Sequence, residues 1–156
     1  MPYPFFEIFG TINFGQFQIE ILKQRRHPEF PDPVGYPLLE EDNEPFHIRL
    51  NLISSEIMGG DEQIQKCYKC SLGNFLTYLA QIQEYGSGGA VISSIGGNLT
   101  VSFDSIQQGS VMVVVHFKSN SCPLNAYRVS FIVPRNEFIM VSLDDVIQRF
   151  HRDITA

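Results

Sequence analysis

Residues 90–133 carry the pattern that most limits how this chain can fold. Three successive runs there have an apolar residue at every second position, at 98–104, 111–117 and 127–133. In the first run, Leu99, Val101 and Phe103 are separated by polar residues. Successive side chains of a strand point to opposite faces, so each run predicts a strand with one apolar face. The rest of the chain has to cover that face.

Other alternating runs predict strands earlier in the chain. They lie at 5–9, 16–24 and 46–52, with a less regular one at 64–70. A turn over residues 10–15, with a glycine at each end, joins the first two predicted strands into a hairpin. In the run at 111–117, Met112 and Val114 make the second face apolar as well, which predicts a central strand.

Two amphipathic helices are also predicted. Ser71 is a suitable N-cap for the first, and glycines from Gly86 onward end it. Ser142 is a suitable N-cap for the second, and Asp144 and Asp145 follow where the helix dipole favours negative charge. Apolar residues at helical spacing form the two buried stripes: Leu72, Phe75, Leu76, Leu79 and Ile82 in the first, and Leu143, Val146, Ile147 and Phe150 in the second.

Together these elements predict an α+β fold. We expect a strongly twisted antiparallel sheet of about six or seven strands with two helices packed on it. The length of 156 residues suits one domain, and neither an internal repeat nor a linker divides residues 1–156. A chain of this length buries roughly 70% of its unfolded surface, so it needs no metal or disulfide to fold.

Residues 27–45 interrupt the pattern of strands. Five prolines fall there, Pro28, Pro31, Pro33, Pro37 and Pro45. Proline lacks an amide donor and restricts the residue before it, so no helix or strand is predicted. A loop of this length inside a domain is often functional, and its role stays open.

The second half of this loop is acidic. It can be a solvated loop, or a patch that attracts a basic partner and raises the rate of association. The candidate partner-binding residues are Glu40, Glu41, Asp42 and Glu44, together with Asp61 and Glu62.

Charge and composition argue against several classes of protein. The net charge of −6 is unsuited to nucleic-acid binding, which needs a basic face. The first ten residues do not resemble a secretory signal, and no apolar run approaches the roughly 20 residues that cross a bilayer. The three cysteines give no disulfide framework. We therefore expect a cytoplasmic protein that binds neither nucleic acid nor membrane.

No motif predicts a catalytic residue, a metal site or a cofactor. Cys67 and Cys70 form a C-x-x-C, but a zinc or redox site would need a second ligand pair or a helix N-terminus beside them. The four histidines have no metal-binding or catalytic spacing. An enzyme with a Cys/His site stays an alternative.

The order of elements over the last two thirds of the chain resembles a known family. After the first helix come Gly-Gly-Ala-Val-Ile at 88–92, Gly-Asn-Leu-Thr-Val-Ser-Phe at 97–103, Val-Met-Val-Val-Val-His-Phe at 111–117, Tyr-Arg-Val-Ser-Phe-Ile-Val at 127–133 and Ser-Leu-Asp-Asp-Val-Ile-Gln-Arg-Phe at 142–150. This pattern is similar to the WapI-type immunity proteins, small bacterial cytoplasmic proteins that protect a cell from a contact-dependent or polymorphic toxin.

The resemblance implies binding without catalysis. An immunity protein neutralises its cognate toxin stoichiometrically, and an acidic inhibitor suits a basic nuclease toxin. The shared pattern lies in the core, so the resemblance assigns no contact residue. A chaperone or adaptor for a secreted effector is a further alternative, and the oligomeric state is left open.

Overall fold

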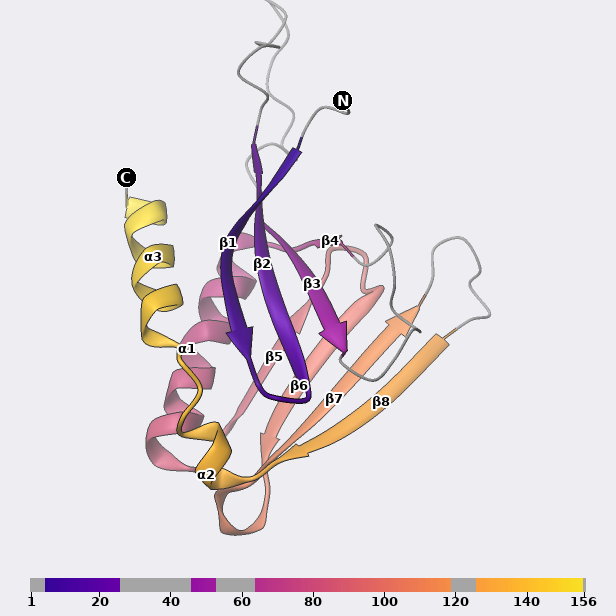
Figure 1. Cartoon of the computed structure of the whole chain (residues 1–156). Helices are drawn as coiled ribbons and strands as arrows, with labels where there is room; N and C mark the ends of the chain where they lie inside the picture. Colours follow the sequence, from indigo (N-terminus) through magenta and orange to yellow (C-terminus); the bar gives the residue numbers. More distant parts are fainter. Residues whose placement is uncertain (1–4, 26–45, 53–63, 119–125, 156) are drawn as a thin grey trace, which may run out of the picture.

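The computed structural model describes residues 5–25, 46–52, 64–118 and 126–155 (Figure 1). The elements, in chain order, are β1 (Phe5–Asn13), β2 (Phe17–Arg25), β3 (Phe46–Leu52), β4 (Gln65–Lys66), α1 (Lys69–Tyr85), β5 (Gly89–Ser93), β6 (Leu99–Ser105), the 3-10 turn η3 (Gln107–Gly109), β7 (Val111–Lys118), β8 (Ala126–Val133), α2 (Arg135–Phe138) and α3 (Asp144–Thr155).

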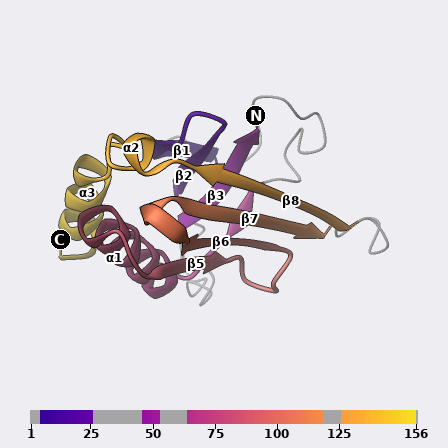
Figure 2. The same ribbon diagram turned by 90° about the horizontal axis from the view of Figure 1, so that it is seen from below.

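The strands form two antiparallel sheets of four strands each. The first has the order β1-β2-β3-β4 and the second β5-β6-β7-β8. The sheets lie face to face, with α1 and α3 on the same side of the pair (Figures 1 and 2). The α+β class and the antiparallel pairing are confirmed, whereas the single sheet of six or seven strands is not what the structure shows.

The division into two sheets has a local cause. β4 is only two residues long and pairs with His47 and Ile48 alone. The chain enters α1 directly afterwards, at Lys69, and α1 carries it to the first strand of the second sheet. Alternation along a strand shows that one face is buried but does not show which element buries it. Here the apolar faces of the two sheets bury each other.

Aromatic rings join the two sheets and α1 into one core. The Phe17 ring of β2 stacks on Phe131 of β8, with centroids 5.2 Å apart, and lies 6.2 Å from Phe103 of β6. Phe75 of α1 lies 5.6 Å from the same Phe103 ring. Phe103 therefore contacts both the opposite sheet and the covering helix.

Helix α1 begins two residues before the expected cap. Tyr68 is its N-cap and makes no side-chain capping hydrogen bond, and the Leu72 amide donates to the Tyr68 carbonyl at 3.0 Å. Ser71 therefore lies inside the first turn, and the predicted strand at 64–70 shrinks to β4. The end of the helix is as predicted, because Gly86 is left-handed, with φ of 74°.

The first hairpin turns later than predicted. β1 continues to Asn13, with a shift of register between Ile8 and Gly10 that marks a β-bulge. The turn follows at Phe14 to Gln16, where the Gly15 amide donates to the Asn13 side-chain oxygen at 2.8 Å. At the other end of the chain, α3 begins at Asp144, so Leu143 rather than Ser142 directly precedes its first residue.

The short helix α2 ties the end of α1 to the rest of the molecule. The Arg135 guanidinium donates to the carbonyls of Ile82 and Gln83, at 2.8 and 2.7 Å. The Gln83 side-chain amide donates in return to the carbonyls of Phe138 and Val141, at 3.1 and 2.6 Å. The Ile82 carbonyl also accepts the Gly86 amide at 2.8 Å. The Gln83 carbonyl lies in the last turn of α1, where carbonyls lack a partner inside the helix, and Arg135 supplies one.

Helix α3 packs closely on β1 because of a glycine. A Cβ atom built on Gly10 would lie 3.0 Å from Cγ2 of Val146. Nearby, the Arg149 guanidinium donates to the Phe9 carbonyl at 3.2 Å, and Lys23 of β2 pairs with Asp153 at 2.5 Å. The bulge and the glycine together leave room for the helix against the edge of the first sheet.

The Gly10→Ala substitution should therefore destabilise the protein. We expect the free energy of unfolding to fall by about 1–3 kcal/mol, since the added methyl group overpacks the contact with α3. The measurement is chemical denaturation followed by circular dichroism. The control is the same substitution in a Val146→Ala background, where the cost should shrink because the crowded methyl group is gone. An equal cost in both backgrounds would contradict the contact.

Candidate functional site

The six predicted partner-binding residues lie outside the described residues. They are Glu40, Glu41, Asp42, Glu44, Asp61 and Glu62. Their role therefore stays a prediction. The whole proline-rich region 27–45 falls in the same part of the chain.

The C-x-x-C pair does not form a shared site. Cys67 is buried, and its thiol donates to the Phe46 carbonyl at 3.6 Å. Cys70 lies in the first turn of α1 and is exposed. Within the described parts of the chain, no group of three His, Cys, Asp or Glu side chains could hold a metal ion.

The described histidines lie on three different elements. His47 of β3 is 8% exposed, and its ring lies 4.8 Å from Phe6. His116 of β7 is exposed and stands beside Arg128 of β8 in the strand register. His151 lies on α3, and His27 belongs to the part of the chain that is not described.

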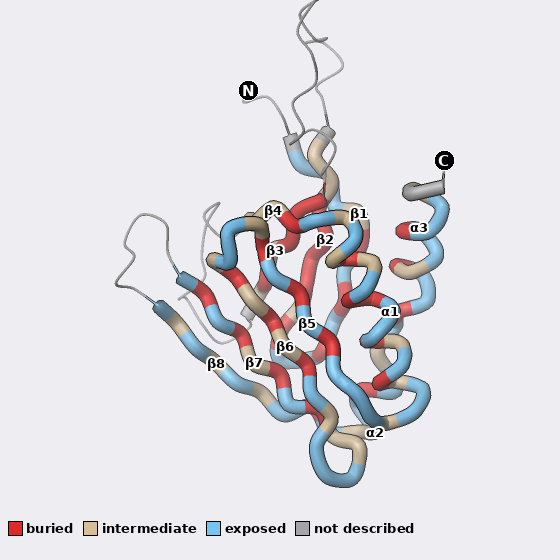
Figure 3. The backbone as a smooth tube through the Cα atoms, turned by 180° about the vertical axis from the view of Figure 1, so that it is seen from behind, coloured by how far each residue is buried: buried red, intermediate tan, exposed pale blue. Residues whose placement is uncertain are grey.

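The outer face of the second sheet carries exposed apolar side chains. Val91 of β5, Met112 of β7 and Ile132 of β8 are 56%, 36% and 52% exposed. Val114 lies among them and is half buried. These four residues are called the apolar patch below. Figure 3 shows this sheet from behind, with buried and exposed positions alternating along its strands.

A polar row borders the apolar patch. The register places Thr100, His116 and Arg128 side by side on β6, β7 and β8, with Ser93 beyond Thr100 on β5. No described helix or strand covers this face (Figures 1 and 3). Exposed apolar side chains beside polar groups are typical of surfaces that bind another protein. This face is therefore the best candidate site among the described residues.

Sequence reasoning identified the strand, and the resemblance pointed to the outer face with His116 and Arg128, but the apolar patch on that face was missed. β7 lies between β6 and β8, as its apolar pattern predicted. Met112 and Val114 were expected to be buried by their apolar character, yet both point away from the core. An apolar residue on the polar side of an otherwise alternating strand was the signal that could have shown an exposed patch.

A shallow cleft lies between the first hairpin and the connection from α2 to α3. Its volume is about 570 Å³, and Thr11, Asn13 and Glu137 are among its polar lining residues. Among the described residues that line it, Glu137 alone is ionisable, and Met140 at its margin is 80% exposed. The lining offers hydrogen bonds and a single charge, which does not point to a particular ligand.

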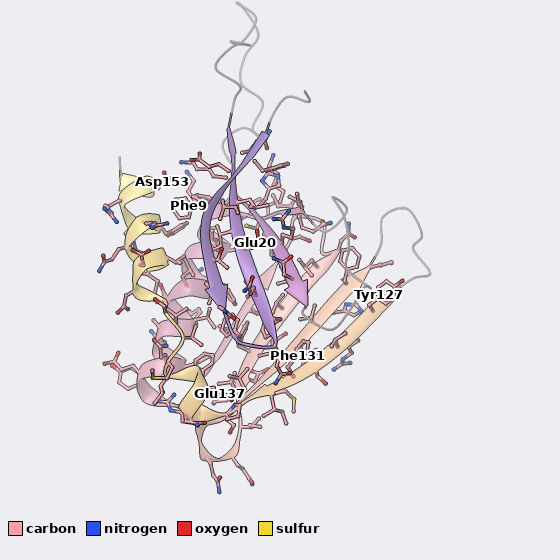
Figure 4. All side chains as sticks on the ribbon, viewed as in Figure 1. Phe9, Glu20, Tyr127, Phe131, Glu137 and Asp153 are labelled. Atoms are coloured by element: carbon pink, nitrogen blue, oxygen red, sulfur yellow. The ribbon has the colours of Figure 1, made fainter. Side chains whose placement is uncertain are left out.

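An ion pair between a buried glutamate and a partly exposed arginine lies on the outer face of the first sheet. The Glu20 carboxylate accepts hydrogen bonds from Arg49, at 2.6 Å, and from the Asn51 amide (Figure 4). The strand register places Glu20 directly opposite Arg49. Glu20 is 7% exposed, so its charge depends on these donors for compensation. This cluster has the character of a structural ion pair.

Comparisons of this chain with protein-family models, with curated proteins and with solved structures found no match. None of the helices in the described parts of the chain is both long and apolar enough to span a membrane.

Removing Arg49 should cost stability. We expect Arg49→Met to lower the free energy of unfolding by about 1–3 kcal/mol, because Glu20 stays buried with one donor fewer. Lys118→Met, which removes an exposed cation from β7, should change stability by less than about 0.5 kcal/mol. Denaturation of both variants measures this. The double variant Glu20→Gln/Arg49→Met should recover part of the loss, and a wholly additive loss would contradict the ion pair.

Proposed function

We propose that this protein is an immunity protein that binds and neutralises a cognate bacterial toxin in the cytoplasm, without catalysis. The main support is the apolar patch on the outer face of the second sheet. An exposed apolar surface on a folded domain is stabilised when another protein covers it. The resemblance of the strand and helix pattern to WapI-type immunity proteins supports the same function.

Two surfaces would contribute to the complex in different ways. The apolar patch would supply burial at the centre of the contact, where a few side chains carry most of the binding energy. The acidic residues Glu40, Glu41, Asp42 and Glu44, with Asp61 and Glu62, would attract a basic toxin domain, such as a nuclease, from a distance.

Co-expression tests the function directly. The product of the adjacent gene is expressed alone and together with this protein, and cell growth is measured. Relief of toxicity together with a stable 1:1 complex is the expected result. The proposal is refuted if the product of the adjacent gene is toxic and this protein neither binds nor neutralises it. Binding of an extended targeting segment without relief of toxicity would instead indicate a chaperone or adaptor.

The apolar patch makes a specific prediction for binding. Val91→Lys/Met112→Lys should weaken the complex with the toxin at least tenfold, because it places two charges in the buried contact. The matched control is Tyr78→Lys/Tyr85→Lys, which makes the same change at two exposed apolar positions on α1, 47% and 71% exposed. Isothermal titration calorimetry measures both. Equal losses in the two variants would argue against the patch as the contact.

The acidic residues are predicted to raise the rate constant of association with the toxin. Replacing Glu40, Glu41 and Glu44 by Gln and Asp42 by Asn should lower the association rate constant more than it raises the dissociation rate constant. Surface plasmon resonance at several salt concentrations measures both constants. The association rate constant of the unchanged protein should fall steeply as the salt concentration rises, and that of the variant should fall less. If neither salt nor the substitutions change the association rate constant, electrostatic attraction between the acidic residues and the toxin is excluded.

A further inference from the structure

The described edges of the two sheets differ in how they are protected. β1 lies against α3, and β5 lies against α1 (Figure 2). β4 is only two residues long. β8 is an eight-residue edge strand, and no other described helix or strand lies beside its outer edge (Figures 1 and 3). An edge strand presents backbone N–H and C=O groups that can pair with another strand.

β8 also lacks the features that usually prevent such pairing. Its register with β7 runs from Val133 to Ala126 without a bulge. Its sequence, Ala-Tyr-Arg-Val-Ser-Phe-Ile-Val, contains no proline and no lysine. Its one charged residue is Arg128.

The core is incomplete along this edge. The core-facing residues Tyr127, Val129 and Phe131 are only half buried, although Tyr127 and Phe131 pack against the core. Figure 4 shows Tyr127 near the start of β8 and Phe131 further along the same strand, close to the first hairpin. A further strand beside β8 would cover these side chains and also pair the backbone groups at its outer edge, which no other described strand pairs.

We propose that this strand is β8 of a second copy of the chain. In an antiparallel pair about a twofold axis at Val129, Tyr127 of each copy lies opposite Phe131 of the other. Arg128 of each copy then lies opposite Ser130 of the other. Aromatic cross-strand pairs stabilise a sheet, and no like charges face each other in this register.

Charge selects this register from its neighbours. A slip by one residue would place core-facing side chains against outer ones, so registers change in steps of two. One such step places Arg128 opposite Arg128 of the other copy, which is repulsive. The other step places Arg128 opposite Ile132. Only the register centred on Val129 gives Arg128 a polar, uncharged partner and keeps both aromatic pairs.

The dimer would form one continuous eight-stranded sheet from two copies of the second sheet. Ile132 of one copy would lie opposite Ala126 of the other, so the two apolar patches would share one face. Dimer formation does not depend on the toxin, and the protein alone is sufficient to test it.

Sedimentation equilibrium of the full chain over a range of concentrations tests the dimer. Ser130→Arg places a second arginine opposite Arg128 at two symmetric positions, so it should raise the dimer dissociation constant about 2- to 30-fold. Ser130→Glu creates two opposite-charge pairs and should lower it by a similar factor. Ser130 is exposed, so neither change should disturb the fold, which circular dichroism checks.

Two further variants make the test specific to this register. Arg128→Glu/Ser130→Arg exchanges the charges and should restore dimerisation. Ser102→Arg and Ser102→Glu make the same changes on β6, two strands away on the same face, and should have no effect. A protein that stays monomeric at all concentrations overturns the proposal. The proposal is also overturned if substitutions at Ser102 and Ser130 change the dimer dissociation constant equally, or if substitutions at neither position change it.

Discussion

The inner faces of the two sheets are apolar, and they are buried against each other and against α1 and α3. Phe17 shows the constraint most directly. It extends from β2 into the second sheet, stacks on Phe131 and lies close to Phe103. Removing apolar surface from water is the dominant favourable term in folding, so neither sheet is expected to be stable without the other. The helices then close the side where the sheets separate.

The helical cover depends on local details of the strands. Gly10 lets Val146 approach β1, and Gly73 of α1 likewise lies close to the Phe150 ring, which a Cβ atom would approach within 3.0 Å. Arg135 and Gln83 connect α2 to the end of α1 through side chains that bond to backbone carbonyls. The two glycines let α3 pack closely against β1 and α1. The side chains of Arg135 and Gln83 bond to backbone carbonyls and so hold α2 against the end of α1.

The sequence predicted most strands and both long helices because their periodicities are strong. The stripe from Leu72 to Ile82 is buried throughout, and β6, β7 and β8 lie within one residue or two of their runs. The division into two sheets was missed, because alternation does not show what buries a face. The start of α1 was missed because Tyr68 caps it with its backbone alone. The apolar patch was missed because Met112 and Val114 suggested burial on both faces. The acidic candidates lie outside the described residues and remain predictions.

The packing that builds the core leaves the outer face of the second sheet and the outer edge of β8 without a covering helix or strand among the described residues. If β8 joins two copies, the apolar patches of both come to lie on one sheet face, and a partner large enough to cover the twofold axis contacts both. Such a partner binds the dimer more tightly than the single chain. By linkage, it then stabilises the dimer by the same factor. Partner binding and self-association would therefore strengthen each other through the one strand, β8, that carries part of both surfaces.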